Sequence, residues 1–266
     1  MSFLPPFLHA INPAYVISGF GVGFLVGITG VGGGSLMTPI LVLLFGVHPV
    51  TAVGTDLIYA SITKTGGSLV HGFNKTIDWR VVGRLALGSL PASLLTLGAL
   101  YVFRIDTAAS NALISKVLAV ALLLTVVSLL MRKRLLATYS KRVGLLSPEK
   151  TRRLTILTGA VLGVLVTISS IGAGAIGVTA LLLLYPELPI KKIAGSDIAH
   201  AVPLTLVAGL GHLMSGAINI PLLESLLVGS LPGIMLASAF APRLPDAALR
   251  YTLAATLLLV AVKLLM

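Results

Sequence analysis

Residues 29–35 read Thr-Gly-Val-Gly-Gly-Gly-Ser and interrupt an apolar run, from about Tyr15 to Phe45, that is too long for one membrane crossing. A looser copy, Ser-Ser-Ile-Gly-Ala-Gly-Ala, occupies residues 169–175 within a second long run, Leu154–Leu184. Glycine allows a chain to reverse, and irregular backbone at membrane depth is tolerated only where it is buried in protein or lines a cavity. We therefore predict that the two glycine turns are the halves of one intramembrane site. For either turn alone, close helix packing of the small-xxx-small type is the alternative.

Composition assigns the chain to the helical membrane proteins. Of its 266 residues, 56% are hydrophobic and only 10% are charged, which is too little charge for the surface of a soluble domain. The apolar runs are continuous rather than alternating, which favours helices over a transmembrane barrel. The N-terminal segment lacks the pattern of a cleaved secretory signal, so we expect the first apolar segment to be retained. The fold class that follows is an all-α polytopic membrane protein.

The positive charge is concentrated in one segment. The net charge is +11, and eight of the nineteen Lys and Arg residues fall between Arg132 and Arg153. The positive-inside rule predicts that such a segment is a cytoplasmic loop, which explains the basicity without a nucleic-acid partner. No cysteine is present, so disulfides and thiolate chemistry are excluded.

An internal repeat divides the chain into two halves. Gly54-Thr55-Asp56 matches Gly195-Ser196-Asp197, His71 matches His212, and Gly-Ser-Leu-Pro at 88–91 recurs at 229–232, all at one offset of 141 residues. Self-similarity of this kind indicates repeated structural units. We predict a first membrane repeat over residues 1–131, a basic cytoplasmic loop over 132–153 and a second membrane repeat over 154–266. Each repeat has about five helical segments and opens with a Gly-rich broken-helix hairpin.

The charges also predict how the repeats are oriented. If the basic loop is cytoplasmic, the connection that carries Lys75, Arg80 and Arg84 is also cytoplasmic, whereas its uncharged counterpart, Ser215–Pro221, is external. The repeats would then be inverted, with both termini extracytoplasmic and with hairpins that meet near the midplane. Secondary transporters with inverted repeats bind substrate at that position. A parallel four-plus-four arrangement, in which each broken stretch crosses once, is the alternative.

The candidate site residues gather at the hairpin tips. The second limb of each hairpin starts just after the glycines, so its first N–H groups favour a small anion and not a metal cation. We expect Lys64 near the bilayer centre, where a lysine marks either a function or a buried ion pair, for example with Asp56. The predicted substrate-binding residues are Thr29, Gly30, Gly32, Gly33, Gly34, Ser35, Lys64, Ser169, Ser170, Gly172, Ala173 and Gly174.

Four further residues are candidates for ion coupling or gating. They are Asp56 and Asp197, which follow a Gly-Thr or Gly-Ser pair early in a helix, and the two histidines of the repeat, His71 and His212. The alternative for the aspartates is stabilisation of a helix N-terminus, and for the histidines it is a capping or interfacial role. The sequence predicts no catalytic residue, no metal site and no cofactor.

These motifs resemble those of a known family. Gly-Val-Gly-Gly-Gly-Ser at 30–35, followed by Pro39, His48-Pro49 and Val53-Gly54-Thr55-Asp56, is similar over nearly the whole chain to the sulfite exporter TauE/SafE family of anion transporters. The resemblance implies a permease of the cell inner membrane for sulfur oxyanions or organosulfonates such as sulfite or sulfoacetate, coupled to ion gradients in ways that vary. The implied partners are a small anionic substrate and the lipid bilayer, with a homodimer as a candidate assembly. The resemblance does not fix the substrate or the direction of transport.

Other classes fit less well. An intramembrane protease of the rhomboid type needs Gly-x-Ser-Gly, and neither Ser18-Gly19 nor Ser215-Gly216 has glycine two residues before the serine. A lipid pyrophosphatase needs clustered carboxylates and an arginine-rich phosphate motif, which the hairpins lack. A metal permease needs His, Asp and Glu at ligand spacing. An anion channel or an accessory membrane protein stays open as the alternative to a transporter.

Overall fold

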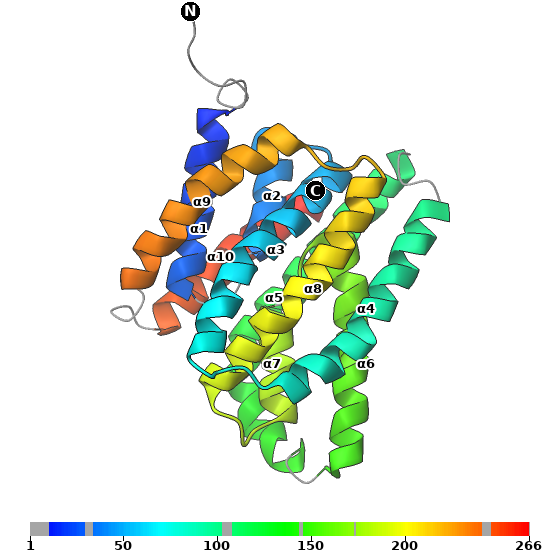
Figure 1. Cartoon of the computed structure of the whole chain (residues 1–266), viewed down its shortest axis with the longest axis vertical. Coiled ribbons are helices and arrows are strands. Elements are labelled where there is room, and N and C mark those ends of the chain that lie inside the picture. Colours follow the sequence, from blue (N-terminus) through cyan, green and yellow to red (C-terminus); the bar gives the residue numbers. More distant parts are fainter. Residues whose placement is uncertain are drawn as a thin grey trace, which may run out of the picture.

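The computed structural model in Figure 1 describes residues 11–29, 34–102, 108–143, 146–172, 174–240 and 246–265, and within these ranges it is helical without strands. The helices are α1 (Pro13–Thr29), α2 (Gly34–Phe45), α3 (Pro49–Phe73), α4 (Trp79–Val102), α5 (Ala108–Val143), α6 (Pro148–Ser169), α7 (Ala175–Leu184), α8 (Ile190–Met214), α9 (Ile220–Phe240) and α10 (Asp246–Leu265). Five of them, α4, α5, α6, α8 and α9, are long and apolar enough to cross a membrane. The predicted all-α class is confirmed.

The two broken stretches each form a long helix followed by a short one. α1 ends at Thr29 and α2 begins at Gly34, whereas α6 ends at Ser169 and α7 begins at Ala175. With 12 and 10 residues, α2 and α7 are only about 15–18 Å long, roughly half the thickness of the hydrocarbon. Each of these second limbs is therefore too short to cross a bilayer.

The middle of the molecule is an antiparallel helix pair, α3 and α8 (Figure 1). Near one end Gly54 of α3 contacts His212 of α8, and near the other end His71 of α3 contacts Gly195 of α8. Residue numbers therefore rise along one helix as they fall along the other. This pair carries most of the buried charged groups of the described chain, so its packing positions the candidate site.

Two outer pairs, α1 with α9 and α4 with α6, flank this centre (Figure 1). A Cβ atom at Gly88 of α4 would overlap the carbonyl oxygen of Ile156 in α6, and one at Gly229 of α9 would overlap that of Val16 in α1. Small residues of this kind let two membrane helices approach backbone to backbone. Gly88 and Gly229 are equivalent in the sequence repeat, so equivalent glycines make equivalent contacts in the two halves.

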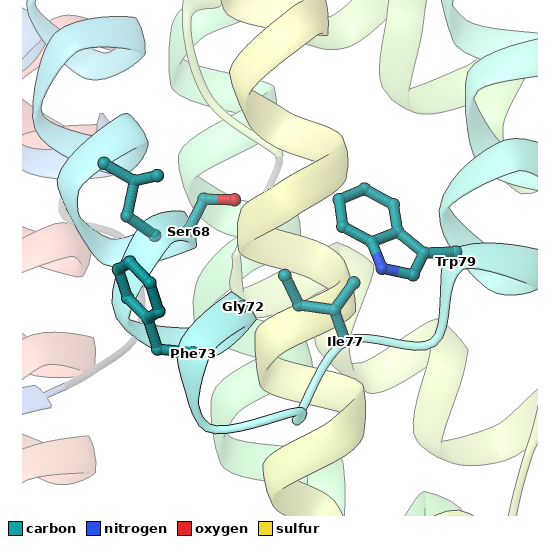
Figure 2. A pocket seen from close by; sticks show the side chains of 6 residues that line it. Ser68, Gly72, Phe73, Ile77 and Trp79 are labelled. Carbon is teal, nitrogen blue, oxygen red and sulfur yellow. The ribbon is translucent and has the colours of Figure 1, made fainter.

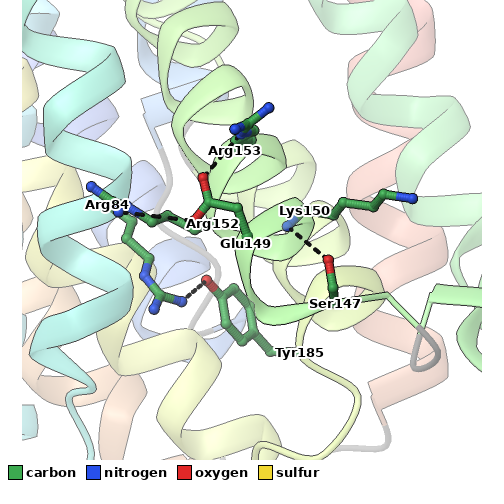
Figure 3. Close-up of polar contacts among 7 residues, drawn as sticks. All are labelled: Arg84, Ser147, Glu149, Lys150, Arg152, Arg153 and Tyr185. Carbon is green, nitrogen blue, oxygen red and sulfur yellow. Dashed lines mark hydrogen bonds and ion pairs between the residues drawn. The ribbon is translucent and has the colours of Figure 1, made fainter.

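The basic segment 132–153, which the sequence predicts to be a loop, is instead mostly helical. α5 does not end near Met131 but continues to Val143, and α6 begins at Pro148, so most of residues 132–153 is helical. Lys, Arg, Leu and Ala are good helix formers, and no Gly or Pro interrupts them before Gly144. Ser147 then caps α6 by accepting a hydrogen bond from the Lys150 backbone N–H (3.4 Å). In the first turns of α6, Glu149 pairs with Arg152 and Arg153 (Figure 3).

Candidate functional site

Two buried carboxylates lie beside the short helices of the hairpins. Asp56 of α3 and Asp197 of α8 are 0% and 2% exposed. Thr38, near the start of α2, donates a hydrogen bond from Oγ1 to Asp56 Oδ2 (2.6 Å). The backbone N–H of Gly174, at the N-terminal end of α7, interacts with the carboxylate of Asp197. Each carboxylate therefore lies close to the start of one hairpin's second limb.

The turn between α6 and α7 requires glycine for two separate reasons. Gly172 and Gly174 have φ angles of 132° and 126°, which residues with a side chain rarely adopt. At Gly177, in the first turn of α7, a Cβ atom would overlap Asp197 Oδ1. The first reason concerns the reversal of the chain, and the second concerns the space that the Asp197 carboxylate occupies.

Lys64 interacts electrostatically with both carboxylates. Its side chain is 8% exposed and interacts with Asp197 most strongly and with Asp56 next. Among the residues that the structure describes, its ammonium makes no hydrogen bond and no ion pair within 4 Å. The direct pair with Asp56 that the sequence left open is therefore not formed there. Lys64 is a buried cation that interacts with two carboxylates, neither of which is within 4 Å of its ammonium.

The predicted residues of the second hairpin divide into two groups. The Ser169 hydroxyl donates to the Leu165 carbonyl (2.7 Å) and accepts from the Ile171 N–H (3.3 Å), so it stabilises the turn itself. Ser170, in the left-handed conformation with φ 58°, lies beside Asp56 and is 5% exposed. Its hydroxyl makes no hydrogen bond of good geometry within the described residues. Ser170 and Gly174 thus approach the carboxylates, whereas Ser169 and Gly172 shape the turn.

The first hairpin is described less completely. Thr29 ends α1, and Gly34 and Ser35 begin α2. The remaining predicted residues lie outside the described residues: Gly30, Gly32, Gly33 and Ala173.

A second buried polar pair on α8 and α4 was missed by the sequence reading. His200, which is fully buried, makes a hydrogen bond through Nε2 with Ser89 Oγ (2.7 Å), and its Nδ1 has no partner in the described chain. Its repeat equivalent is Tyr59, which is 2% exposed and interacts with Ser230, the equivalent of Ser89. The signal was present, because both serines belong to the repeated Gly-Ser-Leu-Pro and each partner follows an aspartate by three residues.

The histidines of the repeat lie at the ends of the α3–α8 pair. His212 is fully buried and contacts the Thr167 carbonyl of α6 through Nε2 (3.0 Å). His71 is partly exposed and contacts Thr76 Oγ1 through Nδ1 (2.8 Å). These are structural contacts of the kind that the capping alternative describes.

The C-terminal end of α7 is held by two hydrogen bonds to neighbouring helices. Tyr185, which follows α7, accepts a hydrogen bond from Arg84 Nη1 of α4 (3.1 Å) (Figure 3). It shares another with Thr155 Oγ1 of α6 (2.7 Å). At the equivalent end of α2, Phe45 packs edge-on against Tyr15 of α1, with ring centroids 4.8 Å apart. Both short helices are therefore fixed at the end remote from the turn.

A cavity of about 360 Å³ lies between the end of α3 and the start of α4 (Figure 2). Its walls are mainly apolar and carry no charged side chain, and Phe73 and Trp79 are strongly exposed at its rim. The Ser68 hydroxyl and the Trp79 indole N–H are its side-chain donors, and no cationic side chain accompanies them to bind an anion. The lining residues are Ser68, Leu69, Gly72, Phe73, Ile77 and Trp79.

Comparison with known proteins identifies the family. Residues 15–264 match the family described as Sulfite exporter TauE/SafE. The chain is 38% identical to the probable membrane transporter protein YjnA of Bacillus subtilis (strain 168), over 96% of this chain and 100% of the relative. It is 29% identical to a probable membrane transporter protein of Xylella fastidiosa (strain Temecula1), over 85% and 84% of the two chains. No solved structure matches it. The family and these relatives are membrane transporters and not enzymes, and the chain belongs to the sulfite exporter TauE/SafE family.

Proposed function

We propose that the protein is a permease for small anions, sulfur oxyanions or organosulfonates such as sulfite or sulfoacetate, with one binding site between the two hairpins. The observation that carries this proposal is Lys64, a buried cation that no described residue pairs directly. A buried charge without a close partner is costly, and a bound anion would supply one. The choice of sulfur compounds rests on the family alone.

The groups around Lys64 fit an oxyanion. The Ser170 hydroxyl is buried and makes no hydrogen bond of good geometry within the described residues, and the N–H groups at the start of α7 carry the partial positive charge of a helix N-terminus. Hydroxyl and N–H donors around one ammonium match the acceptor oxygens of a sulfonate or sulfite. The described chain has no group of three or more His, Asp or Glu residues that would hold a metal ion instead.

The transport step that we propose is alternating access between two inverted repeats. The antiparallel α3–α8 pair and the equivalent contacts of Gly88 and Gly229 support a two-fold relation between the halves. In such transporters one half rocks against the other around a fixed midplane site. An anion channel would instead conduct without saturation, and an accessory protein would bind no anion.

The orientation is tested separately. We expect both termini to be extracytoplasmic in the inner membrane, so a reporter fused after residue 266 should be active only in its extracytoplasmic form. A cysteine introduced at Ala137 should be protected from an impermeant thiol reagent in intact cells. A cytoplasmic C-terminus would contradict the inverted arrangement and favour the parallel four-plus-four alternative.

The site is tested by calorimetry on purified protein with sulfite and sulfoacetate. Lys64→Met should weaken saturable binding by about 30-fold or more, the usual effect of truncating one partner of a buried charge pair. Lys263→Met, which removes an exposed lysine near the end of α10, is the matched control and should bind normally. If affinity is unchanged in Lys64→Met, and its lost stability returns in the double variant with Asp56→Asn, Lys64 only neutralises Asp56. No response to any small anion would contradict the transporter proposal itself.

A further inference from the structure

The start of α7 is already occupied by an anion that belongs to the chain. Asp197 interacts with the Gly174 N–H, and its Oδ1 lies where a side chain at Gly177 would be. Helix N-termini bind substrate anions through these same N–H groups. A substrate that uses the α7 end of the site therefore competes with Asp197 for it.

The charges of Lys64, Asp56 and Asp197, which together form the centre of the candidate site, make this competition stronger. With both aspartates ionised, Lys64 balances one carboxylate and leaves one negative charge uncompensated. A substrate anion that arrives at such a centre is repelled, and the low dielectric of the interior strengthens the repulsion. Neutralising one carboxylate removes the competitor and the excess charge together.

We propose that Asp197 is a proton-accepting site coupled to anion binding. A proton from solution adds to the carboxylate, the neutral acid releases the Gly174 N–H at the start of α7, and the substrate anion replaces it there beside Lys64. When the anion leaves, Asp197 loses the proton and returns to the helix start. The inference rests on the proposed anion site, and it assigns the coupling ion as H⁺.

Asp197 is better suited to this role than Asp56. Asp56 Oδ2 accepts a short hydrogen bond from the Thr38 hydroxyl (2.6 Å), which holds that carboxylate against α2. Asp197 Oδ1 is buried and has no hydrogen-bond partner in the described chain, so it can receive a proton without losing a bond.

The neighbouring groups from each packed helix leave few other proton acceptors. α3 contributes Lys64, Tyr59 and His71, which contacts Gly195 of α8 but makes a hydrogen bond through Nδ1 with Thr76 Oγ1 (2.8 Å). α8 contributes His200, and the hydroxyls of Thr38 and Ser170 lie against Asp56. His200 makes a hydrogen bond to Ser89 and interacts with Lys64, so a second positive charge on its ring would be repelled. Among the described residues, Asp56 and Asp197 are therefore the two proton acceptors between which an experiment has to decide.

The test uses the wild-type protein and sulfoacetate, whose charge stays constant at neutral and alkaline pH. Calorimetry in buffers of different ionisation enthalpy gives the number of protons taken up for each anion bound. We expect about one proton, and an affinity that falls about tenfold for each unit of pH above the range in which Asp197 accepts it. Binding without proton uptake and without pH dependence would overturn this inference and leave the anion permease intact. Absence of any anion binding would overturn the permease instead.

Two substitutions locate the proton. In Asp197→Asn, proton uptake should fall to near zero and affinity should lose its pH dependence, because a neutral amide leaves nothing to protonate. Asp56→Asn should keep the uptake, and Glu187→Gln, which removes an exposed carboxylate after α7, is the control and should match the wild type. Uptake that survives in Asp197→Asn but disappears in Asp56→Asn would move the coupling site to Asp56. Because the wild-type measurement needs no variant, poor folding of either variant leaves the inference testable.

Discussion

The close approach of α4 and α6 predicts a large difference between two alanine substitutions in one helix. At Gly88 a new Cβ would overlap the Ile156 carbonyl oxygen and lie 2.8 Å from the Ala160 nitrogen, well inside ordinary van der Waals contact. At Gly83, one and a half turns earlier, no atom lies within 4 Å. Gly88→Ala must therefore push the two backbones apart, whereas Gly83→Ala meets open space.

The magnitude follows from comparing the two variants. Both gain the same helix propensity, about 1 kcal/mol, when alanine replaces glycine. Only Gly88→Ala also pays for overpacking, which costs about 1–3 kcal/mol. The difference in unfolding free energy between the variants should therefore be about 1–3 kcal/mol, or roughly 2–12 °C in midpoint at this chain length.

The assay is thermal unfolding of both purified variants in the same detergent, followed by circular dichroism. Gly83→Ala should melt slightly above the wild-type temperature, and Gly88→Ala should melt roughly 2–12 °C below Gly83→Ala. Equal midpoints for the two variants would refute the reasoning, because they would mean that α4 and α6 do not approach through Gly88.

Three further predictions use the same purified protein. Gly229→Ala should lose as much stability as Gly88→Ala, since its Cβ would overlap the Val16 carbonyl oxygen of α1; a neutral effect would show that the two halves do not pack alike. Tyr185→Phe should lower the unfolding midpoint by the equivalent of about 1–2 kcal/mol, because the Arg84 and Thr155 groups both lose a partner, and no loss would mean that this contact does not hold α7. Gly177→Ala should weaken sulfoacetate binding or shift its pH dependence, because the new methyl group displaces the Asp197 carboxylate; an unchanged titration would argue against that carboxylate position.

The parts of the fold that sequence reasoning predicted are those with strong local signals. The glycine-rich stretches predicted the ends of α1 and α6 and the short helices that follow them, and proline and glycine marked the ends of several helices. The error at α5 has the opposite origin, because basic residues were taken as a sign of a loop although they are good helix formers. Charge predicts which side of a membrane a segment lies on, but it does not end a helix.

The site was harder to predict because helix partners cannot be read from one helix alone. The sequence placed Asp56 and Asp197 at the beginnings of their own helices, where a carboxylate stabilises the N-terminus. In the structure, Asp56 contacts Thr38 of α2 and Asp197 contacts the start of α7. These contacts depend on how α3 and α8 pack against the hairpins, which sequence periodicity does not specify. Lys64 was correctly predicted to be a buried charge, because a lysine in an apolar helix can be recognised without knowing which helices pack against it.

The two repeats share the glycines that pack the helices but differ in the buried polar side chains that form the site. Glycines at equivalent positions make the same backbone contacts in both halves, so the packing is shared. The buried polar side chains differ: Lys64 corresponds to Thr205, and Tyr59 corresponds to His200. Two identical halves would place a lysine on each side of the centre and give two equal cationic positions. With one lysine and two carboxylates, the centre has a single cationic position, and for this reason we expect one anion for each transport cycle and one proton to accompany it.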